Sequence, residues 1–149
     1  MTTRSPRSGE RQGRDYFFVT RKQFFYKRKA GHFLESQKVF DNYYGTPTKQ
    51  VQDVLKKGKN VLLGIDVKGA KVVQRAFPGV VSIFIKPPTL QELKKRLRRR
   101  GSESPQSVQL RLKTARQELK ESIKYNYIIV NDDLKKAGQK LKTIIQSIL

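Results

Sequence analysis

The chain has 149 residues, and its 33 Lys and Arg against 12 Asp and Glu give a formal net charge of +21. This length suits one domain with a sizeable core, and no apolar run reaches the roughly 18 residues of a membrane-spanning helix. The absence of cysteine excludes disulfides and thiolate chemistry, and the single histidine excludes a multi-histidine metal site. The charge predicts an anionic partner: a nucleotide, a nucleic acid or an acidic protein surface.

The composition also bears on location. A chain without cysteine and without a secretory signal is compatible with the cytoplasm, which is our expectation. An organellar location stays open, because residues 1–16 are rich in Arg and Ser, carry no acid before Glu10 and faintly resemble a transit peptide.

In chain order, residues 1–16 lack apolar periodicity and are expected to form a loop. A helix then begins at a capping box formed by Thr20 and Gln23, and it ends at Gly31. A second short helix is expected over residues 48–58, since it has an apolar face and ends at a glycine.

Three apolar runs of strand length follow, at residues 60–67, 80–88 and 125–133. Continuous apolar runs are typical of strands that are covered on both faces. Because they alternate with helices, we predict an α/β fold with a largely parallel sheet. Three strands are few for such a sheet, so one or two more could come from the segment before Ile65, which otherwise is irregular, or they could be absent.

Helices separate and follow these strands. The first is expected over residues 69–79, and the second begins at Thr89, with Glu92 completing a capping box. The third has Ser104 as its cap and a proline at its first helical position, and an amphipathic helix over residues 134–149 closes the chain.

Ligands of open α/β sheets bind at the carboxyl ends of the strands. Asp66 stands at the end of one predicted strand, and Asn131, Asp132 and Asp133 stand at the end of another. Helix capping is the competing explanation for Asp132 and Asp133. Asp66 lies one step before its predicted strand runs out, which is a poor place for a cap, so a binding role is favoured there.

Two groups of arginines are candidates for phosphate binding. Arg4 and Arg7 flank a proline that fixes the backbone, and forked guanidinium groups suit phosphate oxygens. Arg96, Arg100 and Arg111 stand on both sides of the loop sequence GSESP, which could fold over a polyphosphate. Each of these arginine patterns alone is weak evidence for phosphate binding, because most basic helix faces are simply exposed to solvent.

Seven motifs together resemble the guanylate kinases, which transfer the terminal phosphoryl group of ATP to GMP. They are TTRSPRSGE, DYFFV, FLE, NYYGTP, IDVKGA, RLRRRGSES and VNDDL, in the order and spacing of that family. The resemblance covers the whole chain. It implies one domain over residues 1–149, with a GMP-binding region at about 1–58, core segments at 59–88 and 123–149, and a lid region at 89–122.

The resemblance also implies roles for individual residues. The residues that would hold the GMP phosphate are Arg4, Arg7, Tyr16 and Tyr44, and those that would read guanine are Glu35, Thr46 and Asp66. The lid arginines of the transferring phosphate would be Arg96, Arg100 and Arg111, and Asn131 would lie beside the adenine of ATP. Of the paired tyrosines, Tyr43 is expected to pack. The cofactor of an active enzyme would be Mg²⁺ with ATP.

The sequence departs from the family pattern on the side of the phosphate donor. The printed residues contain no G-x-x-x-x-G-K-[ST] loop, the phosphate cradle that a first strand introduces in this family. Gly64 stands where the family has an aspartate of the magnesium–water network. We therefore expect a GMP-binding protein with weak or no catalysis by this chain alone.

A second hypothesis stays open. A guanylate-kinase-like module without catalytic activity could bind RNA, a ribonucleoprotein or an acidic protein through its basic surface. The two hypotheses differ in whether ATP, GMP and magnesium yield product, and in how steeply binding to a polyanion falls with salt.

Overall fold

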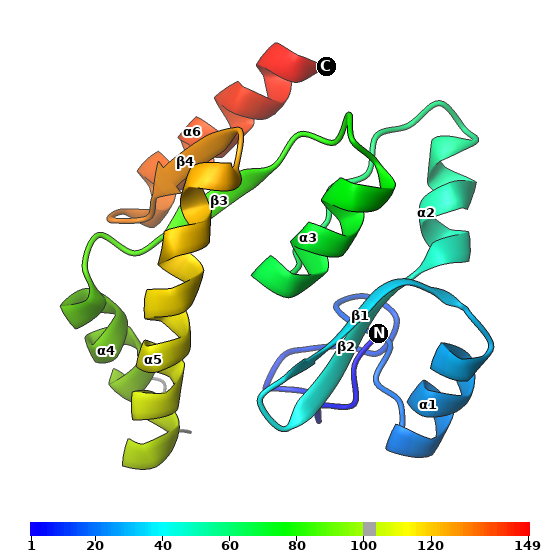
Figure 1. The fold of residues 1–149 in the computed structure, drawn as a ribbon, viewed down its shortest axis with the longest axis horizontal. Helices are drawn as coiled ribbons and strands as arrows, with labels where there is room; N and C mark the ends of the chain where they lie inside the picture. Colours follow the sequence, from blue (N-terminus) through cyan, green and yellow to red (C-terminus); the bar gives the residue numbers. More distant parts are fainter. Residues whose placement is uncertain (100–103) are drawn as a thin grey trace. The chain divides into compact units, whose positions relative to one another are not determined.

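The structure is a computed structural model, and it describes residues 1–99 and 104–149 (Figure 1). These residues form two compact units, Met1–Gly79 and Val80–Leu149. In the described part of the chain, every helix is too short or too polar to span a lipid bilayer. The expectation of one domain over residues 1–149 stays a prediction, and each unit is described by itself below.

The first unit contains a two-stranded antiparallel hairpin of β1 (Phe33–Val39) and β2 (Asn42–Pro47). Val39 lies opposite Asn42, so Phe40 and Asp41 form a two-residue turn, and Phe40 takes a positive φ of 54°. The hairpin lies in the segment before Ile65, where further strands were possible from the sequence but could not be located. Polar side chains stand on both faces of β1, with Glu35 and Gln37 on one and Ser36 and Lys38 on the other, so the alternation of a half-buried strand is missing.

Three helices complete the first unit: α1 (Arg21–Lys29), α2 (Thr48–Leu55) and α3 (Val67–Ala76). The predicted capping box of α1 is confirmed, and Gly31 follows the helix with a φ of 70°. Phe24 of α1 is fully buried and stacks on Phe33 with 4.8 Å between ring centroids. This contact packs α1 onto the hairpin.

The predicted strand over residues 60–67 is wrong. Residues 60–66 have no regular secondary structure, and α3 already begins at Val67. No backbone hydrogen bond joins residues 60–65 to any other described residue, and Leu62 is 71% exposed. An apolar run supplies side chains that favour a strand, but the strand exists only when a neighbour accepts its backbone hydrogen bonds.

The second unit holds the parallel pair of the α/β fold. Strand β3 (Ile83–Lys86) pairs with β4 (Tyr127–Val130), which confirms two predicted strands with shorter bounds. Ser82 fixes their register, because the Asn126 Oδ1 accepts hydrogen bonds from its backbone N at 2.9 Å and from its Oγ at 2.8 Å.

The second unit has three α-helices in its described part, all at predicted positions: α4 (Leu90–Arg99), α5 (Pro105–Glu121) and α6 (Leu134–Ile148). A short 3-10 helix, η1 (Ser122–Lys124), follows α5. Helix α4 packs against α5, where Leu97 and Val108 are buried, and α6 packs against β4, where Ile129 is 1% exposed. Ser104 caps α5 and Asp133 caps α6, so the capping alternative holds for Asp133.

Candidate functional site

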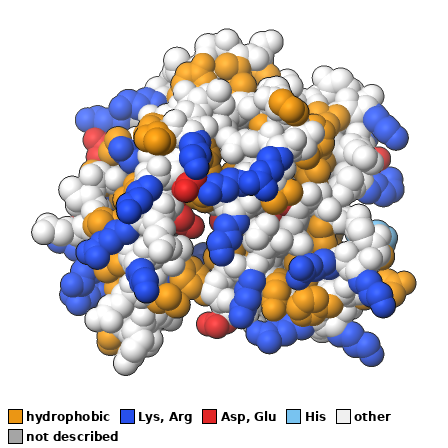
Figure 2. All heavy atoms as spheres, in the orientation of Figure 1, with side chains coloured by type: hydrophobic (Ala, Val, Ile, Leu, Met, Phe, Trp, Pro, Cys, Tyr) orange, Lys and Arg blue, Asp and Glu red, His pale blue; other side chains and the backbone are white. Residues whose placement is uncertain are grey.

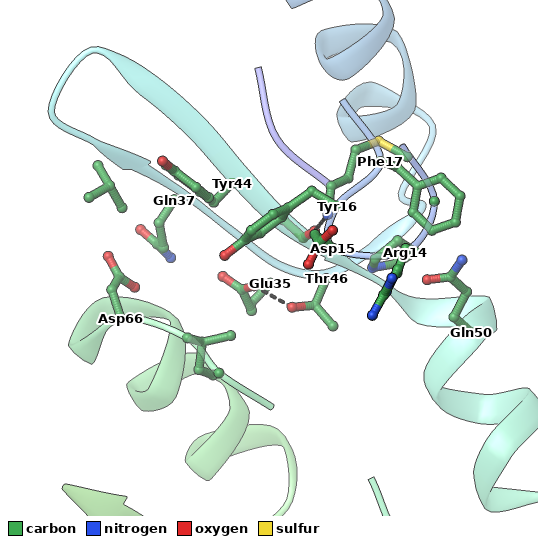
Figure 3. Close-up of a pocket in the computed structure, with 17 residues that line it drawn as sticks. Arg14, Asp15, Tyr16, Phe17, Glu35, Gln37, Tyr44, Thr46, Gln50 and Asp66 are labelled. Carbon is green, nitrogen blue, oxygen red and sulfur yellow. Dashed lines mark hydrogen bonds between the residues drawn. The ribbon is translucent and has the colours of Figure 1, made fainter. Parts of the chain in front are cut away.

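The first unit contains a cavity of about 600 Å³, a volume typical of small-molecule sites. Its walls come from the loop before α1, both strands of the hairpin and the segment that leads into α3 (Figure 3). Five of the residues proposed for GMP binding line it: Tyr16, Glu35, Tyr44, Thr46 and Asp66. Residues far apart in sequence thus meet around one space.

The adjacent tyrosines of β2 face opposite ways. Tyr43 packs against the rings of Phe24 and Phe25, with centroids 5.7 and 4.8 Å away, as expected for a packing residue. Tyr44 lines the cavity and meets Tyr16 edge-on at 6.2 Å. Successive side chains of a strand point to opposite faces, so one tyrosine holds the helix and its neighbour reaches the cavity.

Glu35 is the buried acid of the cavity, and only 6% of its surface is exposed. It lies opposite Thr46 in the hairpin, and the Thr46 hydroxyl donates a hydrogen bond of 2.7 Å to its Oε1, drawn as the dashed line in Figure 3. Burial raises the pKa of the Glu35 carboxyl, and the nearby carboxylate of Asp66 raises this pKa further. The hydrogen bond from Thr46 works in the opposite direction.

Asp66 caps α3, which corrects the argument that it stands in a poor place for a cap. Its Oδ1 accepts a hydrogen bond of 2.7 Å from the amide of Gly69. The described residues give Oδ2 no hydrogen-bond partner, and Asp66 lines the cavity. The residue can therefore cap the helix with one oxygen and present the other to a ligand.

The absence of a side chain at Gly69 brings α3 close to β1. A Cβ atom at this position would lie 2.7 Å from the Glu35 Oε2 and 3.1 Å from the Asp66 Oδ1. Likewise, a Cβ at Gly45 would lie 2.9 Å from the ring of Phe33. The space beside Gly45 is thus filled by the Phe33 ring, which packs within the hairpin.

Glu10 binds both Arg4 and Arg7, a role that was not predicted from the sequence. The Arg4 guanidinium contacts the Glu10 Oε1 at 2.9 Å, and the Arg7 backbone amide donates to Oε2 at 2.7 Å. The bond with Glu10, and secondarily the Tyr44 hydroxyl, raise the pKa of Arg4, and its Cζ lies 5.7 Å from the Tyr16 ring centroid. Arg4 therefore lies behind the two cavity tyrosines, while the Arg7 side chain is exposed.

The candidate residues of the ATP side belong to the second unit. Arg96 is bound on three sides: its Nε contacts Glu92 at 2.9 Å, and its two terminal nitrogens donate to the carbonyls of Asn131 and Asp132 at 2.9 and 3.3 Å. Arg111 is half-buried on α5. Arg100 lies outside the described residues. The structure brings Arg96 and Asn131 together.

The whole chain matches the model of one protein family. The family is Guanylate kinase, and the match covers residues 1–148. The chain belongs to the guanylate kinase family. It is 44% identical to the guanylate kinase of Clostridium tetani over 98% of its own length and 70% of the relative. It is 46% identical to that of Nitrosospira multiformis over the same shares of both chains.

A solved structure agrees. The crystal structure of guanylate kinase from Anaplasma phagocytophilum matches with a TM-score of 0.83 and 37% identity, over 98% of this chain and 71% of that one. The α/β fold expected from the sequence is therefore confirmed, as is the resemblance to guanylate kinases.

The cavity of this guanylate kinase family member includes polar residues that sequence analysis missed: Arg14, Asp15, Gln37 and Gln50. Gln37 follows Glu35 by two positions, so the period of a strand would have placed it on the same face once β1 was recognised. Arg14 stands in a turn, where no periodicity reports which way a side chain points.

Among residues 1–99 and 104–149, no three or more His, Asp or Glu side chains gather in a group that could hold a metal ion. Gly64 lines the cavity and has no side chain to offer a ligand there.

Proposed function

We propose that the cavity of the first unit binds GMP as the acceptor of a phosphoryl group from ATP. The observation that carries this proposal is the convergence of Tyr16, Tyr44, Glu35, Thr46 and Asp66 on one cavity. Membership of the guanylate kinase family supports the reaction, and the geometry of the cavity supports its role as the acceptor site.

Glu35, Thr46 and Asp66 read the base. Carboxylate oxygens accept the ring N–H and the exocyclic amino protons of guanine, whereas adenine presents no ring N–H on that edge. The Thr46 hydroxyl already donates to Glu35, so it orients this carboxylate. A base other than guanine leaves these buried acceptors without hydrogen bonds. The free-energy cost of the unpaired acceptors is the source of selectivity.

The phosphate of GMP is held by two tyrosines and two arginines: Tyr16, Tyr44, Arg4 and Arg7. Two hydroxyl donors stand at the cavity with the Arg4 guanidinium directly behind them. Glu10 keeps Arg4 in place and ties the Arg7 backbone to the same loop. Forked guanidinium groups and hydroxyl donors together suit a phosphate dianion.

On the donor side, we propose ATP with Mg²⁺, Arg96, Arg100 and Arg111 on the transferring phosphate, and Asn131 beside the adenine. When bound, Mg²⁺ would supply positive charge that neutralises the phosphates of ATP. Arg96 already holds the carbonyls after β4, so in this proposal it also fixes the loop that carries Asn131. Because Gly64 offers no ligand for the metal's water network, we propose that residues 1–149 alone transfer phosphate slowly.

Calorimetric titration with GMP and AMP tests the acceptor site. The wild-type chain should bind GMP and not AMP, and Glu35→Gln should weaken GMP binding roughly tenfold or more, because a carboxylate that accepts two protons becomes an amide with one acceptor. Equal binding of GMP by the wild type and Glu35→Gln would overturn the assignment. A coupled assay for GDP with ATP and Mg²⁺ measures the transfer itself.

A second candidate function, without catalysis, draws on the outer face of α1. Lys22, Tyr26 and Lys29 follow the i, i+4, i+7 spacing of one helix face, and Tyr26 is 74% exposed. Figure 2 shows Lys and Arg side chains far outnumbering acidic ones on the face drawn. Exposed aromatic rings between cations suit single-stranded nucleic acid.

This alternative has a simple test. Binding of a single-stranded RNA should weaken steeply between low and moderate salt, and Lys22→Ala with Tyr26→Ala should remove most of it. Lys135→Ala on α6 removes the same single positive charge and is the control for total charge. No retention of RNA by the wild type would exclude the RNA form and leave an acidic protein as the partner to test.

A further inference from the structure

The turn before α1 presents one arginine to the cavity. Gly13 takes a positive φ of 77°, and its amide donates to the Tyr16 carbonyl at 2.8 Å. The Asp15 carboxylate closes the same turn on the Arg11 amide at 2.8 Å. Arg14 lies between these anchored residues and lines the cavity.

The guanidinium of Arg14 is not used within the described chain. Its backbone amide bonds to the Arg11 carbonyl at 3.3 Å, but no described residue gives its side chain a hydrogen bond or an ion pair. Arg4 of the proposed phosphate site differs, since its guanidinium is already bound to Glu10. A forked donor that lines a ligand cavity without a protein partner is available to the ligand.

The polar groups of the cavity follow a defined order. Figure 3 shows Asp66, Glu35, Thr46 and Arg14 one after another across the view. The hydrogen bond between Thr46 and Glu35 fixes the middle of this series. Asp66 and Glu35 both flank Gly69, which fixes one end. Along this wall, the two acceptors Asp66 and Glu35 are therefore followed by the Thr46 hydroxyl, whose proton is already donated to Glu35. The forked donor Arg14 comes last.

The edge of guanine has the complementary order. The exocyclic amino group and the ring N1–H are donors, and O6 and N7, which follow them around the base, are acceptors. Arginine bound bidentately to O6 and N7 is the commonest specific contact to guanine in protein–DNA complexes. The proton of Thr46 is already directed at Glu35, so Thr46 leaves O6 without a donor.

Building on the function proposed above, we propose that Arg14 reads O6 and N7 of the guanine base, next to the N1–H and amino groups that Glu35 and Asp66 read. With this assignment, the selectivity for guanine over adenine comes from two edges of the base, one read by the carboxylates and the other by Arg14. Adenine carries an amino donor in place of O6, which would face the guanidinium and repel it. Arg14 thus rejects adenine by a mismatch of donors, while the carboxylates reject it by unpaired acceptors.

The test compares GMP with 7-deaza-GMP, which keeps O6 and has a C–H group in place of N7. Titration calorimetry should show that the wild type binds GMP roughly fivefold tighter than 7-deaza-GMP. Arg14→Ala should weaken GMP binding roughly tenfold and abolish this preference. Arg14→Lys keeps the charge without the fork, so most of the preference should still be lost.

Arg11→Ala is the matched control. It removes the same charge from the same turn, its side chain does not line the cavity, and its backbone contacts to Asp15 remain. It should keep the full preference for GMP over 7-deaza-GMP. A preference that persists in Arg14→Ala, or that is absent in a wild type that binds GMP, overturns the role of Arg14. A wild type that does not bind GMP overturns the proposed function instead.

Discussion

Gly69 of α3 lies against the carboxylate of Glu35 on β1, so close that a methyl group at Gly69 would fall 2.7 Å from the Glu35 Oε2. This Oε2 belongs to a buried side chain that Thr46 holds by its other oxygen. The carboxylate therefore cannot swing aside freely. The packing of one helix and the position of the proposed base-reading acid are set by the same glycine.

The first prediction concerns this contact. Gly69→Ala should weaken GMP binding roughly tenfold or more, because the new methyl group displaces the Glu35 carboxylate from the position in which it accepts protons of guanine. The same clash should lower the free energy of unfolding by about 1 kcal/mol or more. Gly138→Ala is the control, since a Cβ there meets nothing within 4 Å in α6. It should raise the free energy of unfolding by about 0.5–1 kcal/mol. Urea denaturation and calorimetry measure both effects.

The second prediction concerns the stability of the fold as a function of pH. The pKa of Glu35 is raised in the folded chain above its ordinary value of 4.5, mainly by burial. The folded state then holds a proton that the unfolded state releases. The free energy of unfolding should fall as pH rises from about 4.5 through the raised pKa. Glu35→Gln should remove this component, so the difference between the two pH profiles isolates it; superimposable profiles would contradict the raised pKa.

The third prediction concerns ligand binding over the same range of pH. Guanine donates protons to the ionised carboxylate, so the affinity for guanosine should rise as Glu35 loses its proton. Guanosine is the probe because it lacks the phosphate of GMP, which titrates near neutral pH. The dependence should vanish in Glu35→Gln, and a rise of affinity that persists in this variant would assign the titration to another group.

The fourth prediction separates the paired tyrosines. Tyr44→Phe removes a hydroxyl at the cavity and should weaken GMP binding roughly tenfold, since hydrogen bonds to charged groups are among the stronger ones. Guanosine binding should stay unchanged, because the lost bond is to the phosphate. Tyr43→Phe keeps the ring that packs on Phe25 and should leave GMP binding as it is. Equal effects of the two substitutions would refute a specific role for the Tyr44 hydroxyl.

The fifth prediction concerns Arg96. Its guanidinium joins Glu92 to the carbonyls after β4, and its side chain is only 29% exposed. Arg96→Ala should lower the free energy of unfolding by about 1–2 kcal/mol, a value reduced for the partial exposure of the pair. Arg98→Ala, at an exposed position of the same helix, should change it by less than about 0.5 kcal/mol. Thermal or urea unfolding compares the two variants.

The sequence by itself determined features that depend on neighbours a few residues apart. The capping box of Thr20 and Gln23 and the cap and proline that begin α5 were readable because each joins residues within one helical turn. Strands β3 and β4 were recognised from their apolar runs. The motifs of the guanylate kinase family were visible for the same reason, since each is a short contiguous string.

Only the tertiary structure decided which backbone groups find partners and which side chains converge. Residues 60–65 look like a strand but make no backbone hydrogen bond to any described residue, whereas the polar hairpin β1–β2 exists because its two halves pair. Asp66 caps a helix whose start was misplaced, and Arg14 lines the cavity with no signal in its local pattern. Such contacts join residues distant along the chain, and local periodicity contains no information about them.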